Sequence, residues 1–184
     1  MVLFLPMSEK HLERLLERAC IYTDAELAVE SWRLDLPDTI TRFLDVPREG
    51  LHDLNRLCVE LHSMGQANWP KLGAVSVFAR PRSANELRQL AINLDKFDFI
   101  PNVSTAEDYG RYMICESGRF AYDPELEEIY NFEKYGQECI DHEEGEFTGQ
   151  GYVAYHGSME LNELMQRDPV EQMQLEQQMG GMFS

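Results

Sequence analysis

The chain has 184 residues, 43% of them hydrophobic, and its formal net charge at pH 7 is −17. The hydrophobic content suffices for a folded core and argues against global disorder. The length allows one domain or two or three small subdomains. The acidity disfavours direct binding to DNA or RNA, because carboxylates and phosphates repel each other.

The N-terminal apolar run MVLFLPM is short and lacks a basic flank. We therefore expect neither a signal peptide nor a transmembrane helix. The cysteines form no CxxC pair and are far apart, at Cys20, Cys58, Cys115 and Cys139. Reduced thiols in a cytoplasmic protein fit this pattern best.

The negative charge is regional. Residues 1–100 hold 15 acids and 12 bases, residues 101–150 hold 13 and 3, and residues 151–184 hold 5 and 1. An acidic region of this kind should attract basic surfaces, including the grooves of proteins that bind nucleic acid. Acidity that serves solubility alone, on an ordinary solvated acidic face, is the alternative.

In the first half of the chain, leucines at helical spacing after Ser8 predict a helix with Ser8 as its N-cap. Residues 26–36 alternate apolar and polar side chains on two phases, which predicts a strand with a bulge at Ser31. The leucines of 51–61 predict a second helix that ends near Gly65.

Further along, Ser83 with Glu86 and Ser104 with Glu107 match the capping box, so each pair predicts a helix start. Asn131 is suited to cap another helix.

Asp123-Pro124 is a good N-cap and first-turn pair, and residues 147–156 are typical of a short strand that contains glycine. The polar tail is interrupted by Pro169; we expect one or two weak helices packed on a partner, or a mobile segment, and mobility beyond Met179.

These elements predict an elongated α+β fold of small subdomains, with short antiparallel strands and a mainly helical middle. Four segments are expected: an N-terminal α/β subdomain (1–48), a helical middle (49–100), an acidic α+β subdomain (101–157), and a polar, partly flexible tail (158–184).

Motifs for catalysis or cofactor binding give little support to an enzyme. The chain contains no GxGxxG, GxxxxGK[ST] or GxSxG sequence. Cys58 and His62 are four residues apart, and Cys139 and His142 are three apart, but neither pair has a second pair to complete a metal site. The residue types present do not exclude a glycosidase-type pair of catalytic carboxylates, yet nothing in the sequence singles out two of the many acids. We expect no catalytic residues, no metal and no cofactor.

Residues 123–147 combine ten acids with one base, Lys134, and with regularly placed apolar side chains. Side chains three or four residues apart on a helix have Cβ atoms about 5–6 Å apart, so carboxylates on successive turns can approximate a row of phosphates. We hypothesise that nine of them imitate DNA phosphates toward a protein partner: Glu125, Glu127, Glu128, Glu133, Glu138, Asp141, Glu143, Glu144 and Glu146.

The hypothesis predicts which side chains of this segment are buried and which are exposed. We expect the apolar side chains of this segment to be substantially buried, namely Leu126, Ile129, Phe132, Tyr135 and Ile140. We expect five acids to be exposed: Glu125, Glu128, Glu138, Glu143 and Glu144. If an aromatic anchor contributes to binding, the candidates are Tyr122, Tyr152 and Tyr155.

Three stretches resemble the ArdA-type antirestriction proteins, particularly the divergent ArdA-like proteins of gut Firmicutes and their mobile elements. They are LHDLNRLCVEL (51–61), INLDKFDFIPNVSTAEDYGRYMI (92–114) and NFEKYGQECIDHEEGEFTGQGYV (131–153). The resemblance spans roughly residues 1–157. Asn102 stands where the family often has Gly, and Gln137-Glu138 where it often has Arg-Asp, which makes this chain more acidic.

The resemblance implies an elongated α+β protein, often dimeric, that mimics bent B-form DNA and has no catalytic residues or cofactor. Family members occupy the DNA-binding groove of type I restriction–modification enzymes. The expected partner is thus a protein with a basic groove, with no nucleic acid and no membrane, and a homodimer is an option. Two alternatives stay open: an anti-CRISPR protein that blocks the nucleic-acid channel of a Cas effector, and an acidic adaptor of a mobile element that mimics nothing.

Overall fold

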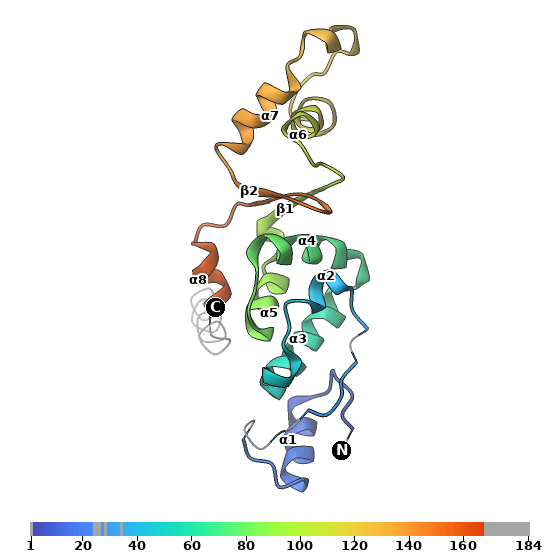
Figure 1. The fold of residues 1–184 in the computed structure, drawn as a ribbon, viewed down its shortest axis with the longest axis vertical. Helices are drawn as coiled ribbons and strands as arrows, with labels where there is room; N and C mark the ends of the chain where they lie inside the picture. The colour runs from blue at the N-terminus through green and yellow to red at the C-terminus, as the bar shows by residue number, and fades with distance from the viewer. Residues whose placement is uncertain (1, 24–26, 28, 34, 168–184) are drawn as a thin grey trace, which may run out of the picture.

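A computed structural model describes residues 2–23, 27, 29–33 and 35–167. The molecule is elongated, with helix α1 at one end, helices α6 and α7 at the other, and a helical middle and a small sheet between them (Figure 1). This is an α+β architecture with short antiparallel strands, and the predicted fold class is confirmed.

The α-helices of the described residues are α1 (Glu9–Arg18), α2 (Asp38–Thr41), α3 (Leu51–Met64), α4 (Trp69–Ala79), α5 (Ala84–Ile92), α6 (Ala106–Arg111), α7 (Phe132–Ile140) and α8 (Leu161–Gln166). The 3-10 turns are Val46–Arg48, Gln66–Asn68, Leu94–Lys96 and Pro124–Ile129. A π-helical turn, Tyr112–Glu116, continues α6.

The strands β1 (Phe97–Pro101), β2 (Glu144–Thr148) and β3 (Gly151–Tyr155) form one antiparallel sheet in the order β1-β3-β2. The central strand β3 is buried along its whole length. Side chains alternate between the faces of a strand, so β3 contributes to a core on each side. Val153 and Tyr155 belong to the larger core, and Tyr152 and Ala154 to the smaller one.

The larger core lies in the helical middle, where α2 to α5 and α8 pack on one another and α4 contacts one face of the sheet. Its members are mainly aliphatic, and several, including Leu57, Leu72, Leu87 and Leu90, are almost fully buried. The smaller core, on the other face, is built around Tyr109, Met113 and Tyr152. It is richer in aromatic side chains, and α6 and α7 cover it.

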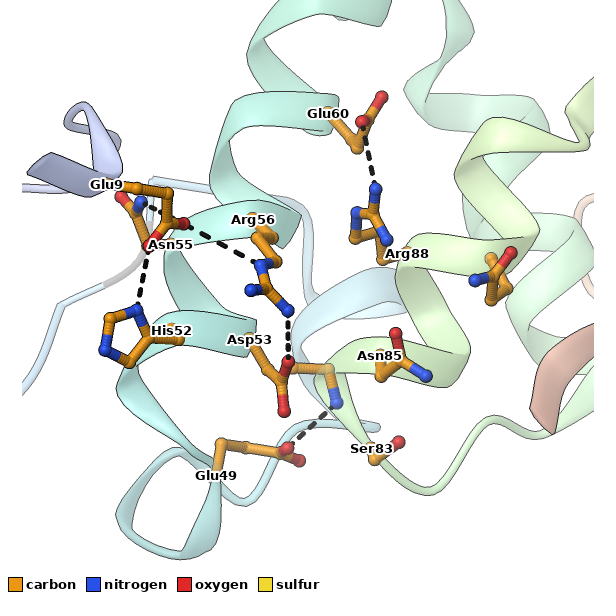
Figure 2. A network of polar contacts seen from close by, with 12 residues as sticks. Glu9, Glu49, His52, Asp53, Asn55, Arg56, Glu60, Ser83, Asn85 and Arg88 are labelled. Carbon is orange, nitrogen blue, oxygen red and sulfur yellow. Dashed lines mark hydrogen bonds and ion pairs between the residues drawn. The ribbon is translucent and has the colours of Figure 1, made fainter. Parts of the chain in front are cut away.

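Polar contacts hold the N-terminal segment on α3 (Figure 2). The buried Asn55 side chain accepts a hydrogen bond from the Met7 amide at 2.9 Å and donates one to the Met7 carbonyl at 2.9 Å. Glu9 lies 2.8 Å from His52 Nδ1 and 3.8 Å from Arg56. Burial opposes ionisation of Glu9, but hydrogen bonds from His52 and Asn55 outweigh it and lower the pKa of this carboxyl.

Several predicted helix boundaries are confirmed. Helix α1 begins after Ser8, and α3 ends at Gly65, whose φ of 75° suits a residue without Cβ. The Ser83 side chain accepts from the Glu86 amide, although the Glu86 carboxylate binds the Arg82 amide instead of the Ser83 amide that a capping box requires.

The predicted cap at Ser104 is wrong by one residue. Thr105 is the N-cap of α6, and Asp108 completes the capping box with it. Ser104 still contributes, since its amide and hydroxyl both donate to the Asp108 carboxylate.

The strand predicted for 26–36, with its bulge at Ser31, is also wrong: none of the described residues in this range lies in a strand. Alternation alone does not make a strand, which needs a hydrogen-bonding neighbour. Val29 and Trp32, on the two predicted apolar phases, are both exposed.

Residues 147–156 are more than one strand. They hold the end of β2, the turn and all of β3, so the glycines mark a hairpin. After it, α8 packs on the chain's own core through Leu164 and Met165. The expected mobility beyond Met179 concerns residues outside those described.

Asn102, at the position where the family often has Gly, has a φ of 62°. This left-handed region is accessible to Gly and, among other residues, favours Asn. Asn at this position is therefore compatible with the backbone conformation that the chain adopts.

Candidate partner-binding surface

The nine predicted carboxylates lie on four consecutive elements at the α7 end of the molecule. Three are on the 3-10 turn Pro124–Ile129, two on α7, two in the turn that follows, and two on β2. Seven are exposed, and two are half-buried, namely Glu127 and Glu143. The prediction of exposure therefore holds for four of its five acids and fails for Glu143.

Local capping explains where these elements begin. The Asp123 side chain accepts from the Glu125 amide, and Pro124 opens the 3-10 turn. The Asn131 side chain accepts from the Lys134 amide at the start of α7. Both predicted caps are confirmed.

The predicted burial of apolar side chains is only partly right. Phe132 is buried, and Tyr135 and Ile140 are half-buried against the smaller core. Leu126 and Ile129, by contrast, are 44% and 77% exposed. Their segment forms a single short 3-10 element instead of an amphipathic α-helix, so it has no long apolar face to turn inward.

Helix α7 is held on α6 by direct contact of the two backbones. A Cβ added to Gly136 would lie 1.8 Å from the Ala106 carbonyl oxygen, and one added to Gly110 would lie 1.9 Å from the Phe132 carbonyl oxygen. Only glycine fits at either position. This contact fixes the face of α7 that points outward, where Glu133 and Glu138 are exposed.

Glu127 is bound within the protein. Arg111 donates from Nη1 to its carboxylate, and the Tyr122 hydroxyl also faces it. These two contacts, that of Arg111 first, lower the pKa of Glu127. The Arg111 guanidinium in turn lies over the Phe132 ring, 4.4 Å from the centroid.

Glu143 joins the sheet to α6. Its Oε2 accepts a hydrogen bond from the Tyr109 hydroxyl at 2.8 Å and from the Tyr152 hydroxyl at 3.3 Å. Burial and the nearby carboxylate raise the pKa of both tyrosines. The two rings pack at 4.4 Å between centroids, so Glu143 is a structural acceptor at the edge of the smaller core.

The other acids differ in how free they are. Glu146 lies 3.4 Å from Arg80, Glu138 lies 4.0 Å from Lys134, and Asp141 accepts from the Gln137 amide group. Four have no ion pair or side-chain hydrogen bond with any residue that the structure describes: Glu125, Glu128, Glu133 and Glu144.

Two of the three suggested aromatic anchors are unavailable. Tyr152 and Tyr155 are buried in the sheet, and Tyr122 is half-buried beside Glu127. Sequence reasoning missed Phe120, which is exposed at this end of the molecule, and Arg111, which organises Glu127 and Phe132. The pairing of Arg111 with acids 4 and 16 residues away was the available signal.

Among the described residues, no group of three or more His, Cys, Asp or Glu side chains is placed to hold a metal ion. No helix in the described ranges has the length and apolarity needed to cross a membrane.

Comparison with known protein families places the nine carboxylates within a matched region. A family model described as antirestriction protein (ArdA) matches residues 2–154, which include all nine carboxylates. No curated protein matches the chain.

Proposed function

The chain belongs to the ArdA family of antirestriction proteins, and we propose that it acts as a DNA mimic that occupies the DNA-binding groove of a type I restriction–modification enzyme. The observation that carries the proposal is the family match over residues 2–154. Within it lies the region of 13 acids and 3 bases, whose charge is opposite to that of a DNA-binding groove.

The mechanism needs no chemical step. Proteins that bind DNA neutralise its phosphates with Lys and Arg side chains, and this contact supplies much of the affinity. Carboxylates on Pro124–Ile129, α7 and β2 would pair with the same cations and so exclude DNA by competition. ArdA family proteins are inhibitors rather than enzymes, which agrees with this mode of action.

The nine proposed contacts are not equivalent. The strongest candidates are the four acids without a described intramolecular partner: Glu125, Glu128, Glu133 and Glu144. Three more acids are exposed, but each already contacts a side chain of the protein, which a cation of the target would have to displace: Glu138, Asp141 and Glu146. Glu127 and Glu143 add to the negative electrostatic potential of this surface while their carboxylates bind Arg111 and Tyr109 within the protein.

The test is competition between the protein and duplex DNA for a purified type I enzyme. A variant with Glu125, Glu128, Glu133 and Glu144 all changed to Gln should lose roughly a thousandfold in affinity, at about 1 kcal/mol per contact. The matched control changes four exposed acids elsewhere, Glu13, Glu17, Glu30 and Glu163, to Gln. We expect it to lose less than tenfold.

Two results would count against the proposal in different ways. An equal loss in both variants would show that the contact surface is not confined to residues 123–147. Full inhibition by the first variant would exclude phosphate mimicry by this segment.

A further inference from the structure

A cavity of about 290 Å³ opens at the acidic end of the molecule. Five side chains line it, and we call it the aromatic socket: Ile114, Phe120, Ala121, Tyr130 and Tyr135. None of the five is among the nine predicted carboxylates. Neither the family match nor the phosphate-mimic hypothesis gives it a role.

Three aromatic rings define the socket. Phe120 and Tyr135 meet edge to face, with ring centroids 5.6 Å apart and planes at 87°. Tyr130 packs in a row between Tyr122 and Phe132, 5.8 Å from each. The rings are therefore held by their neighbours, and the socket is preformed.

The surroundings of the socket are apolar and exposed. Phe120 is 49% exposed, and Ile129, next to Tyr130 in the chain, is 77% exposed. Burial of such side chains is favourable, so their exposure beside a cavity in a folded region indicates a surface that a partner covers.

The charge around the socket selects the occupant. Residues 101–150 carry 13 acids and 3 bases, and the exposed Glu128 and Glu133 flank Tyr130 in the chain. Aromatic faces beside carboxylates attract guanidinium and ammonium groups. The same region shows this pairing internally, since Arg111 lies over Phe132 while it binds Glu127.

We infer that the aromatic socket receives an Arg or Lys side chain from the basic groove of the partner. The inference rests on the proposed function for the identity of that partner. The chain's own Arg119 acts on the Tyr135 hydroxyl, and it also lines a second, polar cavity together with Glu143. A second copy of the chain is disfavoured as occupant, because the two acidic ends would repel each other.

The socket would add a component of binding that duplex DNA does not supply. Contacts between exposed charges weaken as salt rises, because the Debye length falls from about 10 Å at 0.1 M to about 3 Å at 1 M. A cation desolvated on aromatic rings, with its aliphatic stem in an apolar cavity, is screened less.

The first test uses small probes and no restriction enzyme. N-acetyl-arginine amide is titrated into the full-length protein while aromatic NMR signals are followed, and the uncharged citrulline analogue serves as the control. We expect saturable shifts at Phe120, Tyr130 and Tyr135 with the arginine probe alone, and their loss in Ala121→Trp, which fills the socket. No shift at these rings, equal shifts with both probes, or shifts that depend only on protein concentration would overturn the inference; the last would indicate self-association.

The second test uses the type I enzyme. Phe120→Leu removes an exposed aromatic face and should weaken inhibition about 3- to 10-fold, with the loss persisting at 0.5 M salt. Phe4→Leu makes the same change at an exposed site at the opposite end and should have no effect. If the Glu→Gln variant of the preceding section fails to inhibit while Phe120→Leu inhibits fully, the socket is refuted and the mimic stands. If neither variant loses inhibition, both proposals fail.

Discussion

The helical middle and the acidic end pack on opposite faces of one sheet, but they differ in charge and in the side chains that form their cores. Residues 51–100 hold 5 acids and 6 bases, and they bury aliphatic side chains from α3, α4 and α5 in the larger core. Residues 101–150 hold 13 acids and 3 bases, and their smaller core relies on tyrosines and on the close contact of α6 with α7.

The difference shows how a crowded set of like charges is folded. Repulsion among the acids destabilises the compact state, and the core that the described residues form on this side of the sheet is smaller and less aliphatic than that of the middle. Direct backbone packing and internal acceptors such as Glu143 compensate. The outer face is thereby left for the remaining carboxylates.

The substitution expected to destabilise the acidic end most is Gly136→Ala. The new Cβ would overlap the Ala106 carbonyl, so α6 and α7 would have to separate. We expect the free energy of unfolding to fall by about 3 kcal/mol or more, measured by chemical denaturation. Gly149→Ala, where a Cβ meets nothing within 4 Å, should change it by less than about 0.5 kcal/mol. Equal stability of the two variants would refute the role given to the helix contact.

Two neighbouring acids, Glu143 and Glu144, should differ in how much their removal changes the stability of the protein. Glu143→Ala leaves the Tyr109 and Tyr152 hydroxyls without their acceptor and should cost about 1–3 kcal/mol of stability. Glu144→Ala removes an exposed carboxylate with no described partner and should be neutral or slightly stabilising. Thermal unfolding of both variants at low salt is the measurement, and a larger loss from Glu144→Ala would be incompatible with the structure.

The α6 capping box gives a pH-dependent prediction. Hydrogen bonds from Thr105 and Ser104 lower the pKa of Asp108 below its ordinary value of 3.8. The unfolded chain therefore takes up this proton first on acidification, and the stabilisation is present above about pH 4 and lost as pH falls through the folded pKa. Asp108→Ala should cost about 1 kcal/mol at pH 7.

Comparing the Asp108→Ala variant with the wild-type protein isolates the contribution of the Asp108 carboxylate to stability. The difference in unfolding free energy between the two proteins should shrink as pH falls below 3.8, whereas relief of general repulsion affects both alike. Denaturation curves at pH 7, 5 and 3 provide the check. A difference that stays constant with pH would mean that the Asp108 charge does not contribute.

The smallest expected effect on stability is that of Glu128→Gln. This side chain is exposed and has no described partner, so stability should change by less than about 0.5 kcal/mol, and upward if at all. Binding to the target should weaken by about 1 kcal/mol, because one phosphate-like contact is lost among many. Complete loss of inhibition from this one change, with the fold retained by circular dichroism, would contradict distributed mimicry.

Local features were predictable from the sequence. The caps at Ser83, Asp123 and Asn131 act within a few residues, so their residue types suffice to place a helix start. Helix α1 also begins after Ser8, although the Ser8 side chain makes no capping hydrogen bond. The regional acidity and the family resemblance also depend on the order of residues alone. Helix α4 escaped prediction because it is buried nearly all round and lacks an amphipathic pattern.

What the tertiary structure decided is which acids are free. Glu143 binds Tyr109, which is 34 residues away in the sequence, and Glu127 binds Arg111, which is 16 residues away. Glu146 binds Arg80, which is 66 residues away. In the sequence these three acids cannot be told from the acids around them. The aromatic socket and the α6–α7 glycine contact likewise join residues from separate elements. Periodicity and capping report on interactions within one element, whereas a carboxylate becomes structural or available for a partner only when the packed chain brings a donor within reach.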